Sequence, residues 1–161
     1  MDVLGANRLR RVVCSKRYCG DKHDHRLRMR SDRCARKPTT ATAAPAVDPE
    51  IIRHYHAHVY YDPISSRDHA ARLRERVAAA FPDATLGRWH DAPVGPHPQS
   101  MYQIAFPTTL LASFLPWLML NRDGLNILLH PSTGDAYSDH TDHALWFGGA
   151  MPLRLDVLRN A

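Results

Sequence analysis

The alternation of hydrophobic and polar residues predicts strands and amphipathic helices from about residue 49 onward. Between residues 54 and 62 the period is two, which is typical of a strand with one buried face. The two faces of this strand carry Tyr55, Ala57, Val59 and Tyr61 on one side and His54, His56, His58 and Tyr60 on the other. Residues 84–90, 101–106 and 125–130 predict three more strands, and residues 153–157 predict a short last one.

Two stretches between these strands have the period of a helix. The first follows Ser65 or Ser66, which we expect to cap it. Its apolar stripe comprises Ala70, Leu73, Val77 and Ala80. The second follows Thr108 as its predicted cap, and Pro116 should kink or split it. Gly124 closes the next turn, and residues 132–142 predict a polar loop.

The order β-α-β-β-α-β is the split βαβ, or ferredoxin-like, arrangement of the α+β class. It predicts a sandwich in which a four-stranded antiparallel sheet has two helices on one face, an open opposite face and a C-terminal extension. In this order the first and fourth strands are antiparallel neighbours. The end of the fourth strand, at His130, therefore meets the start of the first strand, at residues 54–58.

Charge divides the chain into two parts. Residues 1–45 hold twelve Lys and Arg and four Asp, a net charge of +8, whereas residues 46–161 carry a net charge of −3. Residues 37–47 (KPTTATAAPAV) have no pattern that would bury a face. We therefore predict a basic, disordered extension and linker over residues 1–48 and a folded domain over residues 49–161.

These features exclude several function classes. The basic extension lacks the interleaved aromatic residues of a nucleic-acid-binding module, so we expect no nucleic-acid partner. No apolar run approaches the roughly 18 residues that cross a bilayer. Cys14, Cys19 and Cys34 lie in the extension with His23 and His25, without the paired C-x2-C of structural zinc sites. A domain without cysteine needs no disulfide, and we expect a cytoplasmic location.

Histidine is the residue type in excess. The chain has eleven histidines, against the three or four that an average usage of roughly 2% gives. His54, His56 and His58 lie on the strand face away from the helices, and His130 has the matching parity. Because alternate residues of a strand are about 6.6 Å apart, an H-x-H pair and a histidine from the neighbouring strand can meet at one metal ion. The alternative is polar residues on a solvated strand face.

A proline-rich loop carries another candidate. Residues 92–99 (APVGPHPQ) contain three prolines and Gly95, which stiffen the backbone and fix the direction of His97. In the ideal topology this loop lies far from His130, so it must fold back over the open face or a second subunit must complete the site. Asp139 and Asp142, each followed by a histidine, are candidates for carboxylate–imidazole pairs, and a solvated turn is the alternative.

Four segments of the domain resemble the DOPA 4,5-dioxygenase family. They are YHAHVYYD (55–62), GRWHDAPVGPHPQSMYQIAF (87–106), PWLMLNRDGLNILLHPSTGD (116–135) and DHTDHALWFGG (139–149). The resemblance implies a homodimer that opens the ring of a catechol such as DOPA with molecular oxygen, as an extradiol dioxygenase with non-haem iron(II). The histidines that match the family's motifs are His56, His58, His97, His130 and His140.

Roles follow for individual residues. We predict a metal site, holding iron(II) or zinc in isolated protein, with the ligands His56, His58, His97 and His130. A neutral histidine should take the proton of the catechol, and the catalytic candidates are His140, His90 and His97. The candidates for substrate binding are Tyr60, Tyr102 and Trp146 as an aromatic lining and Arg88 or Arg122 for a carboxylate. Packing and surface charge are the alternative for these five.

A second hypothesis keeps the histidine cluster but makes the protein a metal- or ligand-binding ferredoxin-like protein without oxygen chemistry. A closed tetrahedral zinc site would favour it. A third, an RNA-binding sheet face, is disfavoured because that face carries histidine and the domain is acidic.

Overall fold

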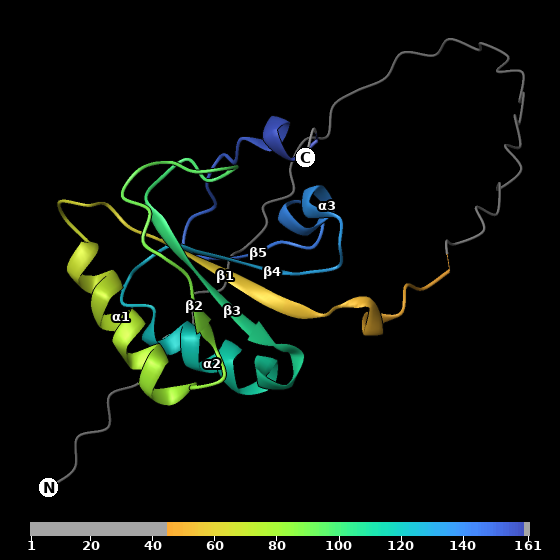
Figure 1. Cartoon of the computed structure of the whole chain (residues 1–161), viewed down its shortest axis with the longest axis horizontal. Helices are drawn as coiled ribbons and strands as arrows, with labels where there is room; N and C mark the ends of the chain where they lie inside the picture. The colour runs from red at the N-terminus through yellow and green to blue at the C-terminus, as the bar shows by residue number, and fades with distance from the viewer. Residues whose placement is uncertain (1–44, 160–161) are drawn as a thin grey trace, which may run out of the picture. The chain divides into compact units, whose positions relative to one another are not determined.

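The computed structural model describes residues 45–159. Nearly all of the predicted N-terminal extension, including its cysteines, lies outside the described residues, so the boundary at residues 48 and 49 stays a prediction. The described chain forms a sheet with helices packed against it (Figure 1). Its strands are β1 (His54–Tyr60), β2 (Thr85–Leu86), β3 (Met101–Pro107), β4 (Ile127–Pro131) and β5 (Leu145–Phe147). Its α-helices are α1 (Arg67–Ala80), α2 (Leu111–Asn121) and α3 (Ala136–His140), and 3₁₀ turns occupy Pro49–Ile51, Thr108–Leu110 and Leu155–Leu158.

The sheet is antiparallel throughout, in the order β2-β3-β1-β4-β5. The first four strands have the ferredoxin-like order, which confirms the predicted α+β class. The extension adds a fifth strand to the predicted four, because Leu145–Phe147 pairs with the free edge of β4. The strand predicted at residues 153–157 is wrong, since Leu155–Leu158 forms a 3₁₀ turn. The second strand is shorter than predicted, and His90 forms only an isolated bridge with Met101.

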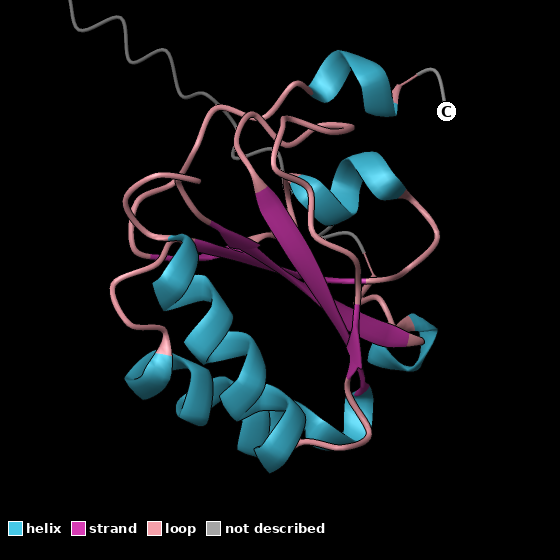
Figure 2. Cartoon of the chain, turned by 60° about the vertical axis from the view of Figure 1, so that its left-hand side comes forward, coloured by secondary structure: helices cyan, strands magenta, loops and turns pink. Residues whose placement is uncertain are grey.

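Helices α1 and α2 cover one face of the sheet, as predicted (Figure 2). The odd-numbered face of β1 lies in this core, where Ala57 and Val59 are fully buried. On α1 the stripe predicted from the sequence is buried except at Ala80, which is exposed because it lies in the last turn. Phe114 and Leu118 bury the matching face of α2.

The predicted helix caps differ from the observed ones. Ser66 is at the N-cap of α1 without a side-chain cap bond, and Asp62 instead accepts from the backbone of Ile64 and Ser65. Thr108 opens a 3₁₀ turn, and α2 begins only at Leu111. Pro116 neither splits nor ends α2, which continues to Asn121. Apolar side chains packed on the sheet hold this helix together despite the missing N–H.

The second face of the sheet is covered, in contrast to the predicted open face. A small apolar cluster centres on Tyr60, Met101 and Leu128 of three neighbouring strands. Partly buried residues from the proline-rich loop and from the chain after α3 pack on it: Val94, Ala144, Trp146, Met151 and Leu153. A protein interior therefore exists on both sides of β1 and β4.

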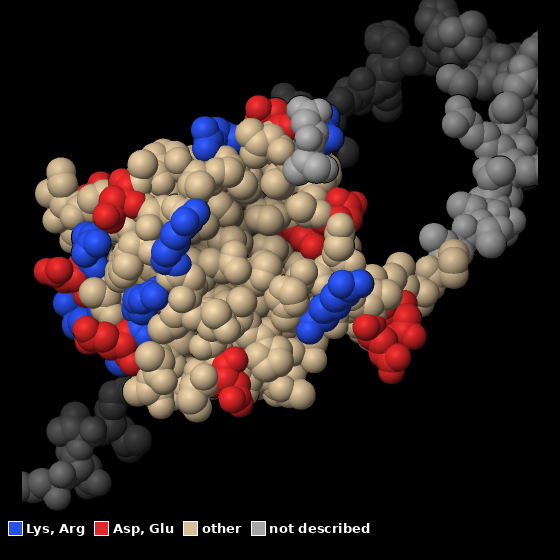
Figure 3. Space-filling view, viewed as in Figure 1, with Lys and Arg blue, Asp and Glu red and all other residues tan. Residues whose placement is uncertain are grey.

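Acidic and basic side chains are interspersed on the face seen in Figure 3, around an area with few charges. This face of the domain carries no basic stripe of the kind that binds nucleic acid. Among the helices of residues 45–159, none combines the length and apolar character needed to cross a bilayer.

Gly148 provides a test of how β5 is held. Its φ of +82° favours glycine, and an added Cβ would meet the Asn126 side chain, whose Oδ1 accepts from the Gly149 amide. We expect Gly148→Ala to reduce the free energy of unfolding by about 1–3 kcal/mol, measured by denaturant titration. Gly134→Ala is the matched control, because Gly134 has a φ of +107° but open space around it. Equal losses in both variants would contradict the role of the Asn126 contact.

Candidate metal centre

Antiparallel pairing of β1 with β4 builds the floor of the site. His56 lies directly opposite His130, and His58 lies opposite Leu128. Side chains of equal parity share a face, so the three histidines project to the side away from α1 and α2. His58 and His130 are buried, with 3% and 2% of their surface exposed. This confirms that the H-x-H of β1 converges with the histidine at the end of β4.

The proline-rich loop brings His97 onto this floor. Val94 and His97 close a turn in which the His97 amide donates to the Val94 carbonyl at 3.0 Å, and Gly95 has a φ of +52°. The chain near the C-terminus fixes the turn, because the Arg154 amide donates to the Pro96 carbonyl and its Nη2 donates to the Gly95 carbonyl. The loop therefore folds back over the sheet, and one chain supplies the histidine without a second subunit.

His140 comes from α3, a helix in the segment predicted as a polar loop. Asp135 caps this helix by accepting from the Tyr137 and Ser138 amides. The buried Asp139 accepts from the amide and hydroxyl of Thr133, which ties α3 to the end of β4. A helix of five residues gives too short a pattern to be predicted from periodicity.

Five imidazole rings meet at this point. His58 Nε2 lies 3.0 Å from His130 Nε2. The ring centroids of His58 and His97, and those of His130 and His140, are each 4.1 Å apart, and His56 lies 5.3 Å from His130. Two groups of three have ligand atoms within 4.8 Å of one another: His56, His58 and His130, and His58, His97 and His140. His58 is the member common to both groups.

Burial keeps these imidazoles neutral. Loss of solvation, followed by repulsion from neighbouring histidines, lowers the pKa of His58 well below its ordinary value of 6.5. The same first cause lowers the pKa of His97 to about 3, and those of His56 and His130 to about 4. Burial also lowers the pKa of His140. Neutral imidazole is the form that binds metals, so protons do not compete for these nitrogens near neutral pH.

Backbone carbonyls orient two of the rings. His130 Nδ1 lies 2.6 Å from its acceptor, the Pro131 carbonyl, and His140 Nδ1 lies 2.8 Å from the Ala136 carbonyl. A carbonyl only accepts, so both rings carry their proton on Nδ1 and direct the Nε2 lone pair elsewhere. The buried His58 Nδ1 has no hydrogen-bond partner among the described residues.

The donor set fits a borderline divalent metal ion. Two nitrogens bound to one ion at about 2.1 Å are roughly 3.0–3.4 Å apart, and the His58–His130 separation of 3.0 Å falls at this spacing. Asp139, the carboxylate next to the cluster, is held by Thr133 and lies 3.4 Å from His143 Nδ1. An all-imidazole site of this kind could hold iron, zinc, copper or nickel.

Other predicted site residues lie at varying distances from the cluster. His90 is close enough to contribute to the low pKa of His97 but belongs to neither group of three. Trp146 lies on β5 and stacks on Tyr60, with ring centroids 5.7 Å apart. Arg88 is exposed beyond β2, and Arg122 Nη1 donates to the Leu125 carbonyl, which closes the turn before β4.

Tyr102 does not lie at the predicted site. It is buried between the sheet and α1, and its hydroxyl donates to the Ala70 carbonyl at 3.0 Å. The parity of β3 sends it to the helix side, together with Ile104 and Phe106. Tyr102 is therefore not part of an aromatic lining near the histidines.

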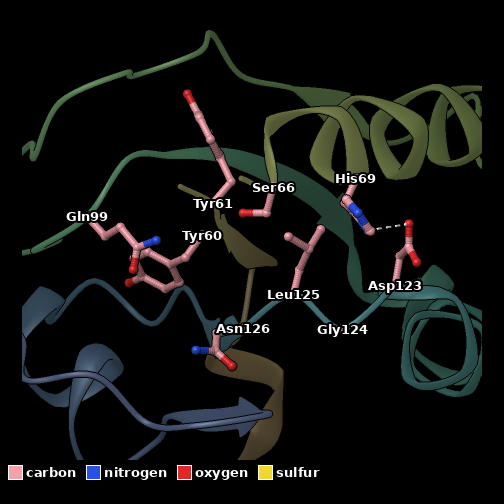
Figure 4. Close-up of a pocket in the computed structure, with 9 residues that line it drawn as sticks. All are labelled: Tyr60, Tyr61, Ser66, His69, Gln99, Asp123, Gly124, Leu125 and Asn126. Atoms are coloured by element: carbon pink, nitrogen blue, oxygen red, sulfur yellow. Dashed lines mark ion pairs between the residues drawn. The ribbon is translucent and has the colours of Figure 1, made fainter. Parts of the chain in front are cut away.

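Tyr60 was predicted only as part of an aromatic lining, but its hydroxyl lies 2.7 Å from His97 Nδ1. The ring also forms one wall of a cavity of about 240 Å³ at the end of β1 (Figure 4). Across this cavity His69 Nδ1 lies 3.0 Å from Asp123. None of the five clustered histidines lines it. The hydroxyl contact has no signature in sequence, because 37 residues separate its partners.

Comparison with known proteins agrees with this geometry. The model of the Dopa 4,5-dioxygenase family matches residues 55–157, a span that contains all five clustered histidines. The chain belongs to this family. It is 33% identical over 129 residues to the DOPA 4,5-dioxygenase of Amanita muscaria, an alignment that covers 73% of this chain and 57% of that protein.

Two other proteins extend the comparison. An uncharacterized 21.2 kDa protein of Botryotinia fuckeliana is 36% identical over 98 residues, covering 56% of this chain and 54% of that protein. The chain thus spans little more than half the length of these two curated relatives. A crystal structure of a protein from Nostoc punctiforme, proposed to be a dioxygenase, superposes with a TM-score of 0.69 at 52% identity, covering 71% of this chain and 98% of that one. Membership of the Dopa 4,5-dioxygenase family supports a dioxygenase-like function.

The low pKa values of the clustered histidines predict how the free energy of unfolding of the metal-free protein depends on pH. The unfolded chain takes up protons near pH 6.5, whereas the folded His56 and His130 do so only near pH 4. Between these values the unfolded state binds more protons, so the free energy of unfolding falls as the pH is lowered. We expect the melting temperature of chelator-treated protein to drop by several degrees from pH 7.5 to pH 5, measured by circular dichroism.

The variant His130→Gln should reduce this pH dependence, because glutamine does not titrate. His69→Gln is the control, since His69 lies outside the cluster. A melting temperature that is independent of pH in the parent protein would contradict the burial of neutral imidazoles.

Proposed function

We propose that this protein is an extradiol ring-cleaving dioxygenase that acts on a catechol such as DOPA with molecular oxygen and non-haem iron(II). The observation that carries the proposal is the convergence of five neutral imidazoles, three of them buried and two partly buried, in a member of the Dopa 4,5-dioxygenase family. Iron(II), when bound, would supply adjacent coordination positions at which a catecholate and oxygen can meet.

The metal ligands in this proposal are His56, His58 and His130. All three lie on β1 and β4, two paired strands whose backbone hydrogen bonds fix the positions of their residues. Their ligand atoms lie within 4.8 Å of one another. His97 and His140 belong to the loop and helix that cover these strands, a position suited to groups that contact the substrate and move its protons.

His140 acts as the general base in this scheme. Its Nδ1–H donates to the Ala136 carbonyl, which leaves the Nε2 lone pair to take a proton. A catechol must lose protons to bind iron through both oxygens, so a neutral imidazole beside the ion is the group that is needed. His90 remains an alternative base, although it lies outside both groups of three.

The substrate is a small aromatic compound in this proposal. Trp146 lies on the histidine side of the sheet and is half-buried, so its ring is the candidate for contact with the catechol ring. Arg88 and Arg122 are the candidates for binding a substrate carboxylate. Arg122 already donates to the Leu125 carbonyl, which leaves the exposed Arg88 as the freer guanidinium.

The resemblance also implies a homodimer, and we keep this assembly and a cytoplasmic location as parts of the proposal. The five histidines come from a single chain, so a monomer could hold the metal.

A second candidate function is metal or ligand binding without oxygen chemistry. The all-imidazole donor set favours it, because zinc accepts the same ligands as iron. Zinc with four protein ligands would leave no position for substrate.

Metal loading of histidine variants tests the ligand assignment. We expect anaerobically purified parent protein to bind one equivalent of iron(II), measured by elemental mass spectrometry. His58→Gln and His130→Gln should lower bound iron at least tenfold. Replacement of a group that only hydrogen-bonds to a metal ligand already costs roughly 10–100-fold in metal affinity, and loss of a ligand should cost at least as much. His69→Gln should bind as the parent does. Full iron binding by His58→Gln would contradict the proposed metal site.

Turnover tests the chemistry. Iron-loaded protein in air should convert a catechol to a ring-opened product that absorbs visible light, measured across a panel with and without a carboxylate. The His140→Gln variant should keep its iron but lose about 100-fold in kcat, the usual contribution of a general base. Tight zinc binding with no turnover of any catechol by iron-loaded protein would favour the binding function instead.

A further inference from the structure

Tyr60 is held in a fixed position on the histidine side of β1. Its side chain is 2% exposed and packs with Met101 and Leu128 of the neighbouring strands. Trp146 stacks on its ring with an interplanar angle of 17°. These contacts hold the ring with its hydroxyl 2.7 Å from His97 Nδ1.

The protons of this contact can be assigned by counting donors and acceptors. The phenol can donate to Nδ1, or it can accept from an Nδ1–H. Among residues 45–159 the hydroxyl has His97 as its hydrogen-bond partner and no second protein acceptor. If His97 donated, the buried phenolic proton would have no protein acceptor, which is costly. If the phenol donates, its proton has Nδ1 as an acceptor, and His97 carries its own proton on Nε2, which is not among the buried side-chain atoms left without a partner in the described residues.

This arrangement is the reverse of that at His130 and His140. Their Nδ1 atoms face the carbonyls of Pro131 and Ala136, which cannot donate, so their Nε2 atoms are lone pairs. His97 alone among these three faces a group that carries a proton of its own. A phenol has an ordinary pKa of about 10 and therefore keeps its proton near neutral pH.

We propose that the Tyr60 hydroxyl locks His97 in the tautomer protonated on Nε2, which makes His97 the hydrogen-bond donor of the centre rather than a ligand of its metal ion. Tyr60 is then a positioning residue for His97. This inference rests on the proposed metal site, and it decides between the two groups of three in favour of His56, His58 and His130.

A neutral N–H donor beside the ion can stabilise negative charge on the reacting oxygen atoms. Negative charge develops on oxygen atoms when a catechol is deprotonated and when oxygen is reduced, and a fixed N–H stabilises such charge. His140 supplies the lone pair and His97 the proton, so the two covering residues have opposite roles. One backbone carbonyl and one phenol suffice to set these roles.

Nitrogen NMR of metal-free protein labelled with ¹⁵N-histidine tests the tautomer without any turnover. We expect His97 to show a protonated Nε2 and an unprotonated Nδ1, and His130 and His140 to show the reverse. Each signal is assigned by its loss in the corresponding His→Gln variant. A protonated Nδ1 on His97 in the parent protein overturns the proposal.

The variant Tyr60→Phe removes the donor and keeps the ring. Its His97 signals should shift toward a mixture of both tautomers, while those of His130 and His140 stay unchanged. Tyr102→Phe is the matched control, because it also removes a buried tyrosine hydroxyl but on the helix side of the sheet. Unchanged His97 signals in Tyr60→Phe contradict the lock, and unchanged melting in both variants shows that folding is intact.

Iron binding separates this inference from the proposed function. His97→Gln should retain one equivalent of iron, whereas His130→Gln should not. If both lose iron equally, His97 is a ligand and the inference is wrong, although the dioxygenase proposal stands. If His97 has the expected tautomer but no catechol is turned over, the dioxygenase proposal fails and the tautomer lock stands.

Discussion

The antiparallel register between β1 and β4 is the constraint on which the site depends. It sets His56 opposite His130 and fixes the face on which both strands present their imidazoles. A shift of β1 by one residue would turn His56 and His58 into the helix-packed core and bring Ala57 and Val59 to the other side. The apolar core against α1 and α2 therefore holds the histidines in place, since no other register buries it.

Coverage of the second face converts these histidines from surface residues into a buried site. The proline-rich loop, α3 and the chain up to Arg154 close over β1 and β4, and bonds from Arg154 fix the loop that carries His97. Burial removes water from the rings and lowers their pKa values, which costs stability in the metal-free protein. A bound metal ion would offset that cost, because it binds the folded state and not the unfolded one.

Neighbouring hydrogen bonds give otherwise identical side chains different chemistry. His130 and His140 each face a backbone carbonyl, whereas His97 faces a phenol. The identity of this partner selects which ring nitrogen carries the proton, and so which rings are donors and which are acceptors. A cluster of five histidines can thus divide into ligands, a base and a donor without a carboxylate among them.

The sequence by itself determined the fold class, the strand order and the side of the sheet on which the histidines lie. Period-two alternation in residues 54–62 and the parity of His130 are local properties, and local properties are what a sequence displays. The motifs that resemble the Dopa 4,5-dioxygenase family pointed to His97 and His140 as well. Sequence patterning failed at short elements, where α3 and β5 have too few residues to show a period.

Only the tertiary structure decided that the second face is covered, that one chain completes the cluster and that Tyr102 lies outside it. It also decided that Tyr60 contacts His97. These facts depend on segments far apart in the sequence, such as Arg154 and Pro96, which meet through a backbone bond available to any residue type. Contacts of that kind leave no pattern along the chain, because they are selected by packing and not by the residues' own propensities.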